Sequence, residues 1–389
     1  MKLEGVKVLD LSAFLPGPHM TMTMADHGAD VVMVEPANGV GEPTRAIGYR
    51  TADDISVWFR NIARGKRSLK INLKDPEAHK LFMDIAKGAD VFVEAFRPGV
   101  VKRLGVDYDA IKAVNPGIVY CSISAFGQTG PYRDRPAHDL AIQGLAGTVA
   151  LNLGLEDGKP ALPNMPSADV TASLNALSAI LMALYRRTQT GEGDYIDIAM
   201  YDSLLAWTPN VTGPVFAEGA APVPKTMRSF GGAGMNNIYE TADGAFLILG
   251  GSEVKFATNL LTALGRPDLI DLAKREPGPV QAPLIAFFQA TFKTKPLAAW
   301  EAILSDIDLC WAPVRTLQEA FDDDHTAARG MRLADENANT HIGPPIKFQN
   351  EPAQPHLKTP DFGAHSEDVA KDVGRSTEDI RTLKGRGVI

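Results

Sequence analysis

The sequence has little cysteine, no long apolar run and no excess of positive charge. Its 389 residues include two cysteines, Cys121 and Cys310, each in an apolar context. We therefore expect two buried free thiols, with no disulfide framework and no cysteine-based metal site. No run of about 20 apolar residues occurs and the N-terminus lacks an apolar stretch after a basic start, so we expect neither a membrane span nor a signal peptide. The expected location is cytoplasmic.

A net charge of −8 disfavours nucleic acid as a partner. The chain has 39 Lys and Arg against 47 Asp and Glu, whereas nucleic-acid binding depends on clustered basic residues. Two nucleotide-binding fingerprints are also missing: no G-x-G-x-x-G follows the first expected strand, and no G-x-x-x-x-G-K-[ST] occurs. Nicotinamide-dependent and nucleotide-triphosphate enzymes are therefore disfavoured.

The first 130 residues alternate strand and helix patterns. Short β-rich runs occur at residues 6–12, 29–35, 89–96 and 118–126. A Pro-Gly-Pro turn and a methionine-rich helix ending at Gly28 follow the first run, and an Asp-Pro-capped helix is expected at 75–87. This alternation predicts a parallel sheet covered by helices. A long helix is expected at 169–188, and then a strand that runs into a helix over 194–207.

Composition divides the rest of the chain. Residues 212–234 are rich in proline and glycine and form the best candidate linker. The block 235–330 has a hairpin-like pair of strands and its own helices. We expect an α/β fold, with a Rossmann-like large domain (1–211), the linker, a smaller α+β domain (235–330) and a C-terminal segment (331–389) that returns to the large domain.

Three ionisable residues are candidates for chemistry. Asp169 stands at the start of a helix, His138 lies beside Asp139 in RPAHDL, and Glu253 opens a further helix in GGSEVKF. Each has a structural explanation as a helix cap or a hydrogen-bonded side chain. The functional alternatives are a nucleophilic carboxylate and groups that transfer protons. A set of basic residues, either solvated surface charge or a phosphate clamp, comprises Lys66, Arg67, Lys74, Arg97 and Arg103.

Six segments together resemble the class III coenzyme A transferase (CaiB/BaiF) family, which includes formyl-CoA transferases and α-methylacyl-CoA racemases. They are VLDLSAFLPGPHMTMTMADHGADVVMVEP, RGKRSLKINLKDPE, VEAFRPGVVKRLGVDY, ISAFGQTGPYRDRPAHDL, DVTASLNALSAILMALYRRTQTGEGDYIDIAM and YETADGAFLILGGSEVKF. The resemblance implies a Rossmann-like domain, a smaller domain and two subunits interlocked as rings. It also implies acyl-CoA and a carboxylic acid as substrates, with coenzyme A as part of a substrate, no covalently bound cofactor and no metal.

Within this resemblance, Asp169 matches the catalytic aspartate, which forms an anhydride and then an aspartyl-CoA thioester. The helix start is expected to keep this carboxylate ionised at neutral pH and to offer N–H groups to an oxyanion. The acyl group is expected to meet Leu15, Phe230 and Met235. Positions that resemble the CoA-binding segments of the family are Pro16, His19, Ile71, Leu73, Lys74, Ala95, Phe96, Arg97 and Arg103.

Two branches of the family remain open. His138 with Asp139, Glu253 and Asp169 match the acid/base motifs of the racemases, which need a group on each face of the α-carbon. Gln143 and the segment 166–193 resemble the transferases more closely. We favour an acyl-CoA:carboxylate CoA-transferase, with a 2-methylacyl-CoA racemase as the alternative. A non-catalytic acyl-CoA-binding homologue is the second alternative.

Overall fold

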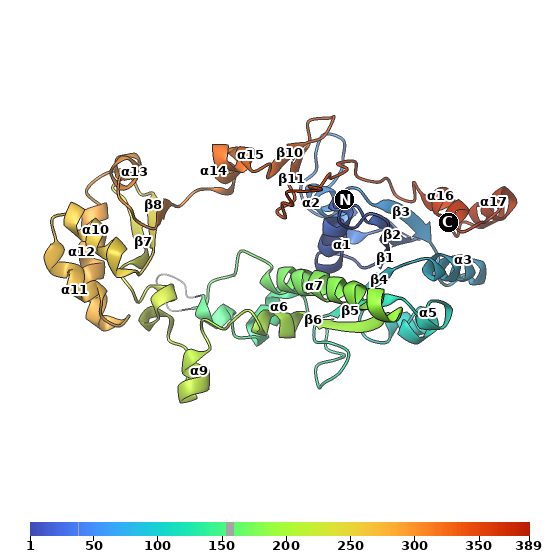
Figure 1. The fold of residues 1–389 in the computed structure, drawn as a ribbon, viewed down its shortest axis with the longest axis horizontal. Helices are drawn as coiled ribbons and strands as arrows, with labels where there is room; N and C mark the ends of the chain where they lie inside the picture. The colour runs from blue at the N-terminus through green and yellow to red at the C-terminus, as the bar shows by residue number, and fades with distance from the viewer. Residues whose placement is uncertain (38, 153–158) are drawn as a thin grey trace. The chain divides into compact units, whose positions relative to one another are not determined.

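We analysed a computed structural model of the protein, which describes residues 1–37, 39–152 and 159–389 (Figure 1). The chain forms two compact units. The larger unit comprises Met1–Ala146, Asn164–Trp207 and Asp324–Ile389, and the smaller unit comprises Gly147–Pro163 and Thr208–Asp323. These boundaries differ from the expected domain ranges, which placed 147–163 and 208–211 in the large domain, 212–234 in a separate linker and 324–330 in the small domain.

A six-stranded parallel sheet, in the order β3-β2-β1-β4-β5-β6, forms the centre of the larger unit. The strands are β1 (Lys7–Leu11), β2 (Asp30–Pro36), β3 (Arg67–Ile71), β4 (Val91–Glu94), β5 (Val119–Ser124) and β6 (Asp194–Ala199). In register, Val8 of β1 lies opposite Val31 of β2 and Val91 of β4. The predicted parallel sheet is confirmed, but β3 was missed, because Arg67, Ser68 and Lys70 interrupt the apolar run that marks a buried strand.

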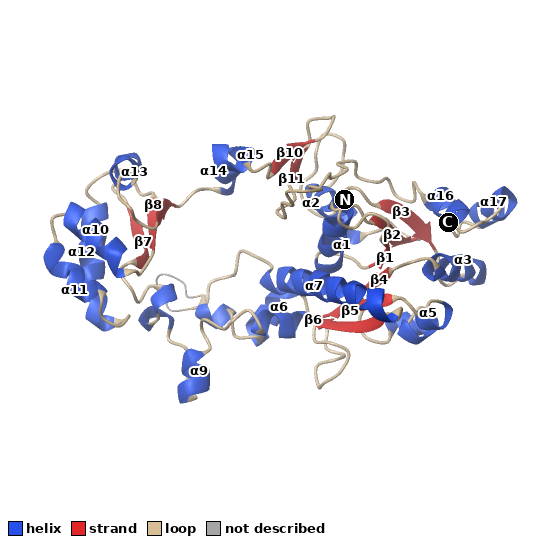
Figure 2. Ribbon diagram, in the orientation of Figure 1, coloured by secondary structure: helices blue, strands red, loops and turns tan. Residues whose placement is uncertain are grey.

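Helices cover both faces of this sheet (Figure 2). One face is covered by α1 (Pro16–Asp26), α6 (Asp139–Leu145), α7 (Ser167–Thr190) and α8 (Met200–Leu205). The other is covered by α3 (Pro76–Lys87), α5 (Tyr108–Val114), α16 (Ser366–Asp372) and α17 (Thr377–Gly385). Alternate side chains of a strand supply the two cores, so Phe92 packs with the α3 side and Val91 with the α7 side.

Several short elements complete the larger unit. They are the helices α2 (Val57–Ala63), α4 (Val100–Leu104) and α15 (Asp324–Ala328), a 3₁₀ turn at Pro43–Ala46, and the antiparallel pair β10 (Arg332–Ala334) and β11 (Thr340–Ile342). The Pro-Gly-Pro segment was expected to form a turn before the helix. It forms instead the first turn of α1. Proline suits the first position of a helix. Only glycine fits at position 17, since an added Cβ would lie 2.2 Å from Ser12 Oγ.

A buried ion pair ties the end of β1 to α1. Lys66 Nζ donates to Asp10 Oδ2 at 3.1 Å, to the Pro18 carbonyl at 2.9 Å and to Thr21 Oγ1 at 2.7 Å. All three ammonium protons thus find an acceptor, as a buried charge requires. Lys66 is therefore neither surface charge nor a phosphate clamp. Arg67, from the same expected basic set, pairs with Asp30 and Asp372.

The smaller unit contains a three-stranded antiparallel sheet. It is built from β7 (Asn236–Glu240), β8 (Phe246–Gly250) and β9 (Trp311–Pro313), and the predicted hairpin is present as β7 and β8. Its helices are α9 (Gly213–Glu218), α10 (Val254–Ala263), α11 (Ile270–Ala273), α12 (Ala282–Phe292), α13 (Leu297–Leu304) and α14 (Leu317–Asp322), with 3₁₀ turns at Val149–Leu151, Pro224–Thr226, Arg228–Phe230, Pro267–Leu269 and Pro279–Gln281. Met235 was expected to contact the acyl group. It is only 2% exposed, because it lies in the core of this unit, so its side chain is not available for that contact.

The two cysteines differ in burial. Cys121 on β5 is buried, as predicted. Cys310 is exposed, so the prediction of a second buried thiol is wrong. It immediately precedes β9, the edge strand of the small sheet, where one side of the backbone has no neighbouring strand among the described residues.

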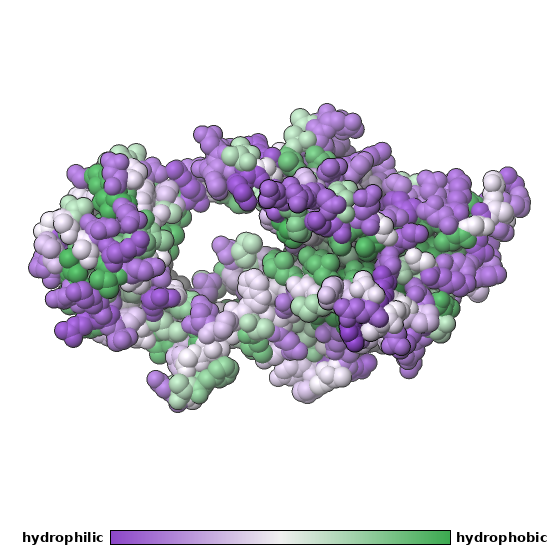
Figure 3. All heavy atoms as spheres, viewed as in Figure 1, coloured by the Kyte–Doolittle hydropathy of each residue, from purple (hydrophilic) through white to green (hydrophobic). Residues whose placement is uncertain are grey.

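The 24-residue helix α7 has two different apolar faces. Small and branched side chains such as Ala172, Ala176 and Ile180 are buried on the sheet. On the opposite face, Met182 and Tyr185 are 69% and 71% exposed, and apolar residues come to the surface beside this helix in Figure 3. Length and composition alone would allow α7 to cross a membrane, which is weak evidence because core helices of globular proteins pass the same test.

Candidate active site

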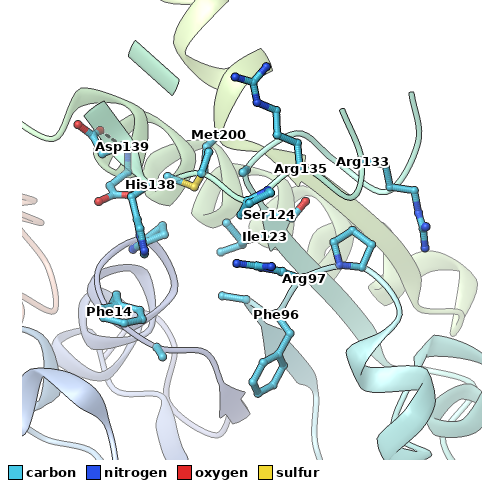
Figure 4. A pocket seen from close by; sticks show the side chains of 18 of the residues that line it. Phe14, Phe96, Arg97, Ile123, Ser124, Arg133, Arg135, His138, Asp139 and Met200 are labelled. Carbon is cyan, nitrogen blue, oxygen red and sulfur yellow. Dashed lines mark hydrogen bonds between the residues drawn. The ribbon is translucent and has the colours of Figure 1, made fainter. Parts of the chain in front are cut away.

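A pocket of about 460 Å³ lies at the carboxyl ends of β1, β4 and β5 in the larger unit (Figure 4). The neighbours β1 and β4 are the point where the strand order reverses, because β2 and β3 extend to one side and β5 and β6 to the other. Chain segments that leave such strands diverge and open a crevice, which is where open α/β sheets bind ligands. Among the lining residues, some lie at or after the ends of these strands and others lie at helix starts. The first set is Ala13, Phe14 and Pro16 after β1, Ala95, Phe96, Arg97 and Pro98 after β4, and Ser124 and Ala125 at the end of β5; the second is His138, Asp139, Asp169 and Met200.

Asp169 presents a carboxylate without a hydrogen bond to this pocket. It is the third residue of α7, whose N-cap is Pro166, so it lies in the first turn and is not the cap itself. Within the described residues its side chain makes no hydrogen bond. Burial and the charge of Asp139 raise the pKa of Asp169 to about 7. The expectation that the helix start keeps this group fully ionised at neutral pH is therefore wrong.

Asp139 explains why the helix start does not stabilise the charge of Asp169. Its Oδ1 accepts the backbone N–H of Ala168 at 2.8 Å and that of Asp169 at 3.2 Å. Its Oδ2 accepts from Gln143 Nε2 at 2.6 Å, and the same amide nitrogen lies 2.9 Å from the carbonyl oxygen of Met165. A side chain of α6 thus caps α7 and occupies N–H groups that were expected to face an oxyanion.

His138 lies beside these carboxylates and faces the same pocket. It is the N-cap residue of α6 and makes no capping hydrogen bond with its side chain. Its exposed ring stands edge-on to Phe14, with ring centroids 5.8 Å apart (Figure 4). Glu253, the third expected acid/base residue, belongs to the smaller unit, where it is the exposed N-cap residue of α10. The structure therefore brings together His138, Asp139 and Asp169, and Glu253 is not part of this pocket's lining.

The residues expected to bind coenzyme A fall into two groups. Pro16, Ala95, Phe96 and Arg97 line the pocket. The other five do not line it. His19 Nδ1 lies 2.8 Å from Ser173 Oγ, within hydrogen-bond distance, and Ile71 and Leu73 belong to or pack against the core of the larger unit. Lys74 and Arg103 are exposed outside the pocket. Their roles in binding stay predictions.

Arg97 is the cation that extends into the pocket. Its side chain makes no hydrogen bond or ion pair with any described residue, and Figure 4 shows its guanidinium between Phe96 and Ile123. Two more arginines, Arg133 and Arg135, line the pocket and were not singled out, although they belong to the YRDRPAHDL segment that carries His138. This arrangement favours an anionic ligand. No group of three or more His, Cys, Asp or Glu side chains that could hold a metal occurs in the described part of the chain.

Phe14 is another lining residue that the sequence analysis did not single out. Its backbone φ is 66°, in the left-handed region that bulky residues rarely adopt. The buried carboxylate of Glu42 holds this conformation by accepting the Phe14 N–H at 2.8 Å. Burial raises the pKa of Glu42, and its hydrogen bonds oppose that effect. Strained residues of this kind concentrate at functional sites.

Comparison with known proteins places these features in a family. Residues 3–366 match CoA-transferase family III. The succinyl-CoA:glutarate CoA-transferase of Mus musculus is 29% identical over 396 residues, covering 100% of this chain and 90% of that protein. The alpha-methylacyl-CoA racemase of Homo sapiens is 31% identical over 398 residues, covering 100% and 98%. The crystal structure of a CAIB/BAIF family protein from Brucella suis has a TM-score of 0.82 at 30% identity, covering 95% of this chain and 99% of that one. The sheet order and the pocket at its switch point agree with this match, which covers nearly the whole chain. The protein therefore belongs to CoA-transferase family III.

Proposed function

We propose that the protein transfers coenzyme A from an acyl-CoA to a carboxylic acid, with Asp169 as the nucleophile. The observation that carries this proposal is the carboxylate of Asp169, which faces an arginine-lined pocket and makes no hydrogen bond with any described residue. A carboxylate without hydrogen bonds and with a raised pKa is a stronger nucleophile than an ordinary aspartate. The assignment of the chain to the family supports the same reaction.

In the proposed reaction, Asp169 attacks the thioester carbonyl of the donor. The C–S bond breaks, the CoA thiolate leaves and an acyl-aspartyl anhydride forms. The thiolate then attacks the aspartyl carbonyl, which gives an aspartyl-CoA thioester and releases the donor acid. The acceptor carboxylate repeats these two steps in reverse order through a second anhydride, so no net proton or electron is consumed.

The pocket supplies groups suited to the two ends of such a substrate. Arg97, which lacks a partner among the described residues, suits the diphosphate of coenzyme A. Phe14 and Met200 offer apolar surface to the acyl chain near Asp169. Succinyl-CoA is a reasonable first donor to test, since the mouse relative bears that substrate in its name.

A donor and acceptor screen tests the proposal. The protein is incubated with a panel of acyl-CoA thioesters and carboxylic acids, and new acyl-CoA species are measured by mass spectrometry. We expect transfer that Asp169→Ala abolishes and that Asp134→Asn leaves intact, because Asp134 is exposed and pairs with Arg133. If no pair gives transfer while the acyl-CoA still binds, the transfer proposal is wrong, and the racemase and the non-catalytic homologue are the alternatives left.

A racemase is the second candidate, and one observation favours it. His138 and Asp169 line the same pocket, as two groups that exchange an α-proton would. Incubation of a 2-methylacyl-CoA in deuterated water distinguishes the two reactions. Transfer predicts little α-deuteration, whereas a racemase predicts rapid α-deuteration that His138→Ala abolishes.

We also propose that two copies of the chain form a homodimer and that the protein acts in the cytoplasm. The exposed apolar side chains of α7, among them Leu181, Met182 and Tyr185, support an assembly that covers this face. The resemblance to a family of interlocked dimers favours a second copy as the occupant.

A further inference from the structure

The contact between α6 and α7 is more specific than helix packing requires. Asp139 accepts two backbone N–H groups at the start of α7, and Gln143 donates to its other oxygen. Gln143 also lies within hydrogen-bond distance of the Met165 carbonyl, just before α7 begins. The side chain of Asp139 is therefore held on both oxygens, between its own helix and the backbone of Asp169.

We propose that Asp139, clamped by Gln143, is a positioning residue that fixes the backbone of Asp169 and leaves its carboxylate without hydrogen bonds. An aspartate in the first turn of a helix normally gains from the free N–H groups and from the helix dipole. Here Asp139 takes those donors, so the carboxylate of Asp169 stays free to attack. The nucleophile itself remains Asp169, and the inference rests on the proposed function for that role alone.

Asp139 affects Asp169 in two ways, through its hydrogen bonds to the start of α7 and through its negative charge. The carboxyl groups of Asp139 and Asp169 both lie at the start of α7, where burial and, second, the charge of Asp139 raise the pKa of Asp169. A group with a higher pKa is a more basic, stronger nucleophile. The clamp thus sets both where the nucleophile lies and how reactive it is.

Several other titratable side chains lie around α7. His138, Arg97, Arg133 and Arg135 line the pocket with Asp169. The elements packed on α7 carry further titratable side chains: His19 on α1, Asp202 on α8, and Asp194, Tyr195 and Asp197 on β6. Among all of these groups, Asp139 is the one whose charge contributes to the raised pKa of Asp169.

The test uses chemical labelling and needs no acyl-CoA. A 2-diazo-2-arylacetamide esterifies protonated carboxyl groups, because the carboxyl proton goes to the diazo carbon and the carboxylate then displaces N₂. The ester at Asp169 is measured by peptide mass spectrometry between pH 5 and 9. We expect labelling of the wild type to fall with a midpoint near 7. In Asp139→Asn, which keeps an oxygen that caps α7, we expect the midpoint to move down by about one pH unit or more.

The matched control is Asp134→Asn, which removes the same charge from the preceding loop without touching α7. Its midpoint should match that of the wild type. If Asp139→Asn does not fold, Asp139→Gln also removes the charge and has an amide oxygen on a longer side chain that can reach the start of α7. An unchanged midpoint in the folded neutral variant would overturn the proposal, since a purely structural cap would not shift it.

Gln143→Met tests the clamp separately. The change keeps the charge of Asp139 and the side-chain volume but removes the amide that holds it. In the transfer assay we expect kcat to fall by about tenfold with KM nearly unchanged, because a small displacement of a nucleophile slows the chemical step. An unchanged kcat would show that Gln143 is not needed. If the wild type transfers no CoA, the proposed function is wrong while the labelling result for Asp139 still stands.

Discussion

Replacing Asp169 with asparagine should abolish activity and make the protein more stable. Burial and a neighbouring carboxylate raise the pKa of Asp169 from 3.8 to about 7, so ionisation of this group is unfavourable in the folded state. The folded protein then holds a proton that the unfolded chain releases, and stability falls as the pH rises from about 4 to 7. A pKa rise of this size corresponds to at most about 4 kcal/mol. Because the side chain is partly exposed, we expect on the order of 2 kcal/mol.

The assay is urea denaturation of the wild type and Asp169→Asn at several pH values. Asparagine has a similar shape but carries no charge, so it removes the cost of ionisation. The variant should gain on the order of 2 kcal/mol at pH 8, and the gain should vanish near pH 4, where the wild-type carboxyl is protonated. Asp134→Asn, at an exposed ion pair, is the control and should change little. A gain that is independent of pH, or a loss of stability at pH 8, would refute the reasoning.

The kcat/KM for CoA transfer should fall to about a tenth of its plateau at pH 6, because Asp169 attacks as the anion; a flat profile between pH 5 and 8 would contradict this. Lys66→Met should destabilise the protein by about 3–5 kcal/mol in urea denaturation, since it leaves Asp10 as an unpaired buried charge, and adding Asp10→Asn should restore part of the loss. Met182→Asp on the exposed face of α7 should give monomers in light scattering while Gln189→Asp does not, and two dimeric variants would exclude this face as the interface.

Most strands and the long helix were predictable, because short stretches of sequence determine where such elements form. Apolar runs bounded by glycine and proline marked five of the six strands of the large sheet, and the long periodic segment marked α7. The strand β3 was missed because its half-buried positions carry Arg67 and Lys70, and only pairing with β2 shows that it is a strand. The burial of Lys66 was equally invisible, since its acceptors on β1 and α1 lie more than 40 residues away in the chain.

The site was predictable in some of its residues but not in its electrostatics. His138, Asp139 and Asp169 were expected, and the structure places all three in one pocket. The ionisation of Asp169 was misjudged because a helix start predicts stabilised negative charge, while a carboxylate 30 residues earlier already occupies the N–H groups. The role of Phe14 depends on a left-handed backbone conformation, which no residue type in that segment predicts.

The most direct test of the central claim is to trap the covalent intermediate. The protein is incubated with succinyl-CoA and then treated with hydroxylamine, which converts an aspartyl anhydride or thioester into a stable hydroxamate. We predict a hydroxamate on Asp169, located by peptide mass spectrometry, and none on Asp139 or Asp134. Efficient CoA transfer by an enzyme that never acquires this modification, or a hydroxamate on another carboxylate, would contradict the account.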